Sequence, residues 1–184
     1  ALTKANDLTG HLMGFAREKQ ATAEAMDVTA QLQNLGPLLR ILVPKGVALR
    51  VEPHFEPVLI RSSSSQFDHV IVNLVSNAKD ATPQGGTIRI ICKVSGKPEA
   101  QEAVIEVSDT GIGMAPEMIG KVFDPFFTTK SPGKGTGLGL SSVKSVLDAV
   151  QGRLEIESVP GSGSTFRIHL PVLNEAWAAG SAHP

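Results

Sequence analysis

The chain has 184 residues, of which 41% are hydrophobic and 19% charged, and its formal net charge is −1. This balance is typical of a globular domain and disfavours a nucleic-acid partner, because nucleic-acid-binding surfaces are usually basic. One cysteine excludes an internal disulfide and a cysteine-cluster metal site. No apolar run has the roughly 20 residues needed to cross a bilayer, so we expect a cytoplasmic domain. Because the first residue is Ala1, we expect a longer parent protein, either soluble or membrane-anchored.

Two helices are predicted in the N-terminal part of the chain. The first is expected over residues 1–20, because apolar residues recur there at spacings of four and three, the pattern of a helix that packs on another helix. These residues are Ala1, Ala5, Leu8, Leu12 and Phe15. The second is predicted over residues 27–43, and Gly36-Pro37 is expected to bend it or to shorten its first half.

The rest of the chain alternates between strand and helix patterns. Strands are predicted at residues 47–51, 58–61, 87–94, 103–108, 153–158 and 164–170. Helices are predicted at residues 66–81 and 138–150, the former with a capping box formed by Ser65 and Asp68. These elements predict an α/β fold, a two-layer sandwich in which one mixed sheet of about five strands packs on helices.

Three shorter features complete the organisation. Cys92 shares a strand face with Ile88, Ile90 and Val94, so we expect a buried hydrophobe rather than a reactive thiol. Residues 109–137 hold six glycines and three prolines and no long element, and so long a loop is uncommon in a compact domain unless it is functional. The tail from residue 174 is expected to be a linker or a flexible end.

Polar residues form a stripe on the helix predicted at 66–81. Asn73 and Asn77 are four residues apart and therefore project from the same side, and Asp80 lies one turn further along. Amide oxygens beside a buried face can ligate Mg²⁺, which prefers oxygen ligands and often shares its sites with phosphates. The alternative is an ordinary solvated stripe.

A carboxylate ends the strand predicted at 103–108. Alternation places Asp109 on the same face as Ile105 and Val107, so the carboxylate points the same way as buried side chains and needs a hydrogen-bond donor. The exocyclic amine of adenine is such a donor, and Gly111 and Gly113 would let the backbone approach a flat base. The alternative is a simple tight turn.

A glycine-rich run opens the helix predicted at 138–150. Its members are Gly133, Lys134, Gly135, Thr136, Gly137, Leu138, Gly139 and Leu140. Free N–H groups and the positive end of a helix dipole favour phosphate. The run lacks the lysine spacing of a P-loop, and it does not follow a strand in a βαβ unit, which disfavours a dinucleotide-binding fingerprint.

Two further segments are candidates for ligand contacts. Phe123, Phe126 and Phe127 lie in the polar loop and could anchor a mobile lid from which Lys130 reaches a phosphate. The alternative is a small hydrophobic cluster that pins the loop. Thr165, in a glycine-rich hairpin, could contact the ligand or could simply belong to the turn.

The order and spacing of these motifs resemble those of one protein family. Asn-x-x-x-Asn-Ala, Asp-x-Gly-x-Gly, Phe-x-Pro-Phe and Gly-x-Gly-Leu-Gly-Leu look like the N-box, first glycine box, F-box and second glycine box of histidine kinases. These kinases belong to the GHKL superfamily, whose fold is the Bergerat α/β sandwich. The resemblance covers residues 27–170. Residues 1–20 resemble the end of the second helix of the dimerisation hairpin in such kinases.

The resemblance implies a domain order and a set of roles. Residues 1–20 would end the dimerisation helix, 21–173 would form the catalytic ATP-binding domain and 174–184 a flexible tail. Asn73, the catalytic candidate, would lie beside the phosphates and the metal, and Asn77 would ligate Mg²⁺. The other ATP contacts implied are Asp80, Asp109, Gly111, Gly113, Lys130, Gly135, Thr136, Gly137, Leu138, Gly139, Leu140 and Thr165. Asp80 departs from the family, because many relatives carry a basic residue near that point.

The function implied is transfer of the γ-phosphate of Mg·ATP to a histidine. None of the five histidines has the setting of the family's acceptor, so we expect the acceptor on a separate dimerisation domain. The implied partners are that domain, in a homodimer, and a response regulator or receiver domain. Two alternatives are an ATP hydrolase of the same superfamily and a non-catalytic binding module. Hydrolases such as DNA gyrase B have a glutamate base where this chain has Asn73, and an amide cannot take a proton from water.

Overall fold

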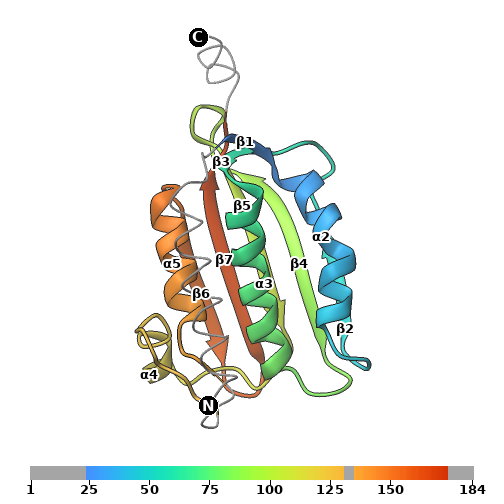
Figure 1. The fold of residues 1–184 in the computed structure, drawn as a ribbon, viewed down its shortest axis with the longest axis vertical. Coiled ribbons are helices and arrows are strands. Elements are labelled where there is room, and N and C mark those ends of the chain that lie inside the picture. The colour runs from blue at the N-terminus through green and yellow to red at the C-terminus, as the bar shows by residue number, and fades with distance from the viewer. Residues whose placement is uncertain (1–23, 131–134, 174–184) are drawn as a thin grey trace, which may run out of the picture.

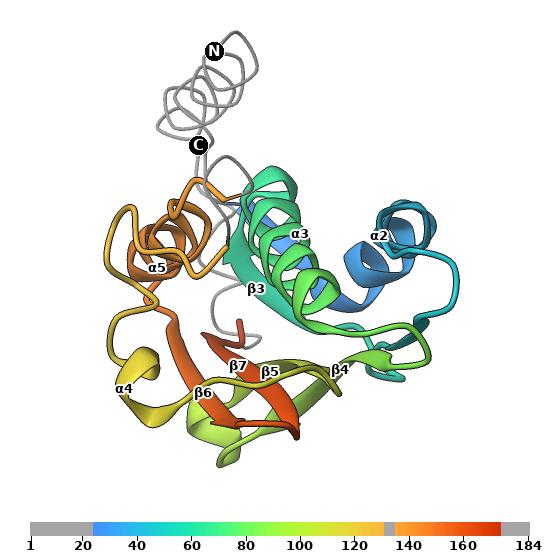
Figure 2. The ribbon, with the colours of Figure 1, turned by 90° about the horizontal axis from the view of Figure 1, so that it is seen from below.

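The computed structural model describes residues 24–130 and 135–173, which form a two-layer α/β sandwich (Figures 1 and 2). Five strands form the main sheet in the order β2-β4-β5-β7-β6. Their bounds are Ala48–Glu52 for β2, Thr87–Ser95 for β4, Glu102–Asp109 for β5, Arg153–Val159 for β6 and Gly163–Pro171 for β7. The β2–β4 pair is parallel and the other three pairs are antiparallel, so the predicted mixed sheet is confirmed.

Three long helices cover one face of this sheet, as the view in Figure 2 shows. They are α2 (Val28–Leu42), α3 (Ser64–Ala81) and α5 (Gly139–Ala149). Two single turns, the 3₁₀ helix η1 (Pro98–Ala100) and α4 (Pro116–Ile119), lie in the loops. Within the described residues, none of the helices combines the length and hydropathy that a membrane span requires.

The hydrophobic core lies between the two layers. In α3, Ile71, Leu74 and Val75 are fully buried, and they belong to the same cluster as Ile90 and Ile105 of the sheet. Burying each such side chain contributes about 1.5–3 kcal/mol. Cys92 is also buried there, and burial raises the pKa of its thiol to about 11, which confirms the expected small hydrophobe.

A second, two-stranded sheet was not predicted. It pairs β1 (Glu24–Asp27) with β3 (Leu59–Ser62), and Val172 forms an isolated bridge to Ile60. The strand expected at 58–61 therefore lies outside the main sheet. Residues 24–27 carry no clear alternation, and their pairing with residues 59–62 is non-local, so the local sequence contains no signal for it.

Two expectations about the helices need correction. The helix α2 runs unbroken from Val28 to Leu42 with Pro37 inside it, so Gly36-Pro37 does not shorten it. The N-cap of α3 is Ser63, whose Oγ accepts a hydrogen bond from the N–H of Gln66 at 3.3 Å. The capping pair is therefore Ser63 with Gln66, because the helix begins two residues earlier than predicted. The helix expected over residues 1–20 lies outside the described residues.

Candidate functional site

The polar stripe of α3 lies against the start of α5. Asn73 is half-buried, its Nδ2 donates to the carbonyl of His69 at 2.8 Å, and a Cβ placed on Gly139 would lie 2.9 Å from its Oδ1. One turn before, His69 Nε2 and Ser142 Oγ are 2.7 Å apart. The structure therefore brings the stripe together with the first turn of α5, and glycine at position 139 permits this approach. Asn77, also half-buried, continues the stripe.

The first turn of α5 is suited to bind an anion. In the described part of the chain no side chain caps this helix, whose N-cap residue is Leu138, and its first turn holds no acidic residue. Thr136 Oγ1 accepts from the N–H of Leu138 at 3.3 Å. A helix of 11 residues with an uncapped first turn presents unsatisfied N–H groups and the positive end of its dipole.

The glycine-rich run approaches this turn along a closely packed path. Gly137 has φ of +68°, and a Cβ there would lie 2.3 Å from the carbonyl carbon of Phe126. Phe126 donates its N–H to the carbonyl of Gly137 at 2.9 Å, while the residue is 69% exposed. Phe126 is therefore held by its backbone and not by a buried ring.

Asp109 lies at the end of β5, as predicted, and is only 7% exposed. Its Oδ1 accepts the N–H of Gly111 at 2.8 Å. Burial raises the pKa of Asp109 above its ordinary value, against the lowering effect of the backbone N–H groups of Gly111 and Ser164. A buried carboxylate with few donors can accept a hydrogen bond from a ligand amine.

The loop after Asp109 packs on the chain's own backbone. A Cβ on Gly111 would lie 2.4 Å from the carbonyl oxygen of Ala81, and a Cβ on Gly113 would lie 2.0 Å from that of Val159. Ile112 donates its N–H to Ala81 at 3.0 Å. The glycines thus bring Asp109 to the C-terminal end of α3, at the same end of the molecule as Asn77.

The sheet register separates Thr165 from Asp109. In the β5–β7 ladder Asp109 pairs with Ser164, and Thr165 pairs with Ser108 on the opposite face. Ser164 is buried on the helix side and lies 3.0 Å from Ser158 Oγ. The residue beside Asp109 is therefore Ser164. This placement can be predicted from the sequence. Ser164 alternates in step with Phe166, Ile168 and Leu170, so it lies on the same face of β7 as these apolar residues.

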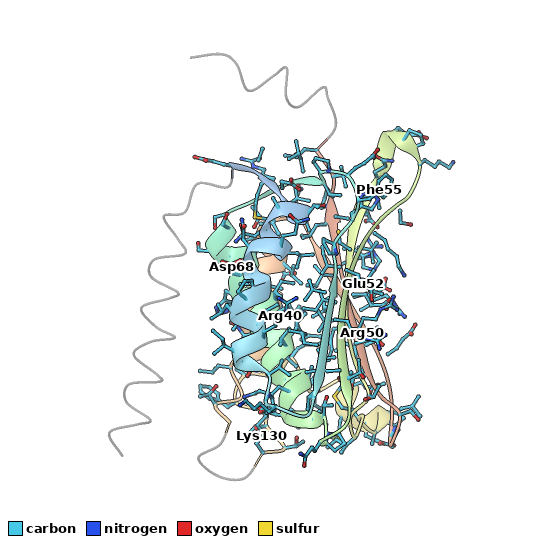
Figure 3. All side chains as sticks on the ribbon, turned by 90° about the vertical axis from the view of Figure 1, so that its right-hand side faces the viewer. Arg40, Arg50, Glu52, Phe55, Asp68 and Lys130 are labelled. Atoms are coloured by element: carbon cyan, nitrogen blue, oxygen red, sulfur yellow. The ribbon has the colours of Figure 1, made fainter. Side chains whose placement is uncertain are left out.

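Lys130, labelled in Figure 3, comes from the loop after α4 and lies at the C-terminal end of the polar stripe of α3. Its Nζ lies 2.5 Å from Asp80 Oδ2, and Lys79 Nζ lies 3.2 Å from Asp80 Oδ1. A Cβ on Gly135 would lie 3.2 Å from Lys130 Cδ, so the glycine-rich run is adjacent. Lys130 and Asp80 come together from positions 50 residues apart.

The oxygen ligands that the site offers are enough for Mg²⁺ only if phosphate oxygens complete its coordination. In residues 24–130 and 135–173, no three histidine, cysteine or carboxylate side chains are grouped so that they could hold a metal ion. The stripe offers the amide oxygens of Asn73 and Asn77 beside an anion-binding helix start. Mg²⁺ keeps several waters and takes phosphate oxygens as ligands, so one or two protein oxygens suffice.

Comparisons with known proteins agree with this geometry. The sequence model of the family described as histidine kinase-, DNA gyrase B-, and HSP90-like ATPase matches residues 62–174. Sensor kinase CckA of Brucella abortus (strain 2308) is 37% identical over 190 residues, which cover 97% of this chain and 20% of that protein. Sensor histidine kinase AtsR of Burkholderia thailandensis is 32% identical, covering 90% of this chain and 28% of that protein.

Both relatives are much longer than the chain, which spans less than a third of either. Among solved structures, the mycobacterial sensor histidine kinase MprB superposes with a TM-score of 0.68 and 25% identity, over 82% of this chain and 97% of that one. The family model covers α3, α5 and four strands of the main sheet, β4 to β7, with Asp109 at the end of β5. The chain therefore belongs to the histidine kinase-, DNA gyrase B- and HSP90-like ATPase family and carries its ATP-binding α/β sandwich.

Proposed function

We propose that this domain binds Mg·ATP between α3 and α5 and positions the γ-phosphate for transfer to a histidine on the dimerisation domain of a longer sensor kinase. The observation that carries the proposal is the close approach of Asn73 to Gly139, where an added Cβ would lie 2.9 Å from the Asn73 Oδ1, so that the amide stripe begins beside an uncapped helix start. The similarity to CckA, a sensor kinase, and to AtsR, a sensor histidine kinase, supports it.

Different residues bind the base, the metal ion and the phosphates of the nucleotide. Asp109 accepts a hydrogen bond from the adenine amine, with Gly111 and Gly113 beside the base and Ser164 in the place expected of Thr165. Asn77 ligates Mg²⁺, which neutralises charge on the phosphates, and Asn73 lies beside it. The triphosphate takes N–H groups from residues 135–140 and the ammonium of Lys130. Phosphoryl transfer depends mainly on such positioning and charge stabilisation.

Transfer is favoured over hydrolysis by the chemistry of Asn73. Its Nδ2 already donates to the carbonyl of His69 at 2.8 Å, and its amide cannot act as the general base that hydrolysis requires. Of the three histidines in the described residues, His54 lies in the loop between β2 and β3, and His69 lies on α3 with its Nε2 2.7 Å from Ser142 Oγ. His169 contacts Glu102 and Glu155 on the helix-free face of the sheet, and none of the three has the sequence setting of the family's acceptor. We therefore place the acceptor outside this domain, with a response regulator or receiver domain as its partner. Because cells supply ATP in the cytoplasm, the domain would act there.

The test of metal and nucleotide binding uses Asn77→Ala. We expect Mg·ATP affinity to fall about tenfold or more, equivalent to about 1.4 kcal/mol, without a change in unfolding midpoint. Asn34→Ala, which alters an exposed asparagine on α2, is the matched control. Calorimetry that shows equal affinity in both variants would remove Asn77 from the site.

The test of transfer uses radiolabelled ATP. We expect the chain alone to bind ATP without becoming labelled, and the longer kinase to acquire acid-labile label that disappears when its acceptor histidine is replaced. Label on the chain alone would place the acceptor within it. Rapid phosphate release without label would support the hydrolase alternative.

A further inference from the structure

An ion pair closes the polar stripe at the C-terminal end of α3. Asp80 Oδ2 lies 2.5 Å from Lys130 Nζ, and Lys79 Nζ lies 3.2 Å from the other oxygen. Burial opposes ionisation of Asp80, but hydrogen bonds from Lys130 and Lys79 outweigh it and lower the pKa of the carboxyl. A carboxylate is therefore present here at neutral pH.

The position of this carboxylate is unusual for a phosphate site. Asp80 lies three residues after Asn77 and seven after Asn73, so all three lie on one side of α3, the side on which Asn73 approaches Gly139. Its partner Lys130 lies beside Gly135, at the start of the described part of the glycine-rich run. A negative charge in this position repels a triphosphate and occupies the lysine that would bind it.

We propose that Asp80 makes nucleotide binding at this site conditional on a divalent cation. This inference rests on the proposed function. Without the cation, the carboxylate holds the ammonium of Lys130 and repels the phosphates. A cation bound to the triphosphate offsets the charge of Asp80, and Lys130 is then free to donate to phosphate oxygen. Asp80 thus acts as a positioning residue for Lys130, and it discriminates between Mg·ATP and metal-free ATP.

A purely structural role for the ion pair leads to a different result. If Asp80 only ties the loop to α3, its removal lowers the stability of the domain. It then weakens the binding of metal-free ATP and of Mg·ATP by the same factor. Conditional binding instead changes the ratio between the two affinities. The ratio of the dissociation constants without and with Mg²⁺ is therefore the quantity to measure.

The experiment is calorimetric titration of ATP into wild type and Asp80→Asn, in Mg²⁺ and in EDTA. We expect Asp80→Asn to bind metal-free ATP about tenfold more tightly and Mg·ATP nearly as before, since one partly solvated like charge has been removed. Asp80→Glu should restore the wild-type ratio. The matched control is Glu52→Gln, which breaks the 2.6 Å ion pair with Arg89 far from the site. Adenosine, which lacks phosphates, should bind every variant equally.

The outcomes separate this inference from the proposed function. If wild type binds no ATP in Mg²⁺, the proposed function fails and the inference fails with it. If wild type binds ATP but Asp80→Asn leaves the ratio unchanged, only the inference is wrong. Should Asp80→Asn fail to fold, Asp80→Ser, which also removes the charge and leaves Lys130 unchanged, takes its place. The ratio of the two dissociation constants should fall as in Asp80→Asn, and an unchanged ratio again overturns the inference.

Discussion

Asp109 shows how one buried group serves binding at the expense of stability. The side chain is 7% exposed, and burial raises the pKa of its carboxyl above the ordinary 3.8. The folded state therefore binds this proton more tightly than the unfolded state does. The linkage relation then requires the group's contribution to stability to be largest below pH 3.8 and to fall as the pH rises through the folded pKa. A ligand amine that donates to the carboxylate reduces this cost.

The direction of this pKa shift predicts how Asp109→Asn changes the stability of the domain. An amide of nearly the same shape can still accept the N–H of Gly111, and it carries no charge to bury. We expect the variant to be more stable than wild type at pH 7, and the difference to shrink as the pH falls toward 3.8 and below. Urea unfolding across this pH range measures it, with the exposed Asp148→Asn as a control. A difference that does not vary with pH would contradict the interpretation.

Other residue-level features differ in how far the sequence could predict them. The burial of Asp109 on the helix side followed from alternation along β5. The same alternation along β7 places Ser164, and not Thr165, on the face that Asp109 shares. The ion pair between Asp80 and Lys130 could not be predicted, because its partners come from segments 50 residues apart that only the tertiary fold brings together.

Among the elements, α3 contributes most to both the core and the site. Its apolar face packs in the core, and its other side carries Asn73 and Asn77. The predicted bounds of the helices and main-sheet strands agree with the structure to within about two residues, because their hydrophobic periodicity is strong. The separate β1–β3 sheet was missed, because short strands that pair at a distance leave little local pattern.

The corrected N-cap of α3 leads to a second prediction. Ser63 Oγ accepts the N–H of Gln66, so Ser63→Ala leaves a donor in the first turn without its partner. We expect a loss of about 1 kcal/mol in the free energy of unfolding. Ser65→Ala should change stability much less, since Ser65 is exposed and its Oγ only contacts that of Ser63 at 3.2 Å. Chemical denaturation compares the two, and a larger loss in Ser65→Ala would restore the original capping assignment.

Across the whole molecule, ligand binding at one end should stabilise the sandwich. Asp109 on β5, Asn77 on α3 and the glycine-rich run before α5 come from three elements, so a nucleotide that contacts them all binds only the folded state. At 100 times its dissociation constant, Mg·ATP should add about 2.7 kcal/mol, which raises the melting temperature of a domain of this size by roughly 5–10 °C.

Differential scanning fluorimetry measures this shift. GTP at the same concentration should give a smaller increase, since its base offers a carbonyl oxygen where adenine has the amine that Asp109 recognises. In Asp109→Asn the ATP and GTP shifts should become similar, because an amide can both donate and accept. Equal shifts for ATP and GTP in wild type would contradict the assignment of Asp109 to the base.

The strand order at the other end of the molecule has a mechanical consequence. β3 lies between β1 and the end of β7, where Leu173 donates its N–H to Leu59 at 2.7 Å. Both neighbours run antiparallel to β3, so β1 and the end of β7 run in the same direction on either side of it. Tension between Glu24 and Leu173 would load the hydrogen bonds in shear and all together, since they lie perpendicular to the strands. The force would pass through β3, which leads directly into α3.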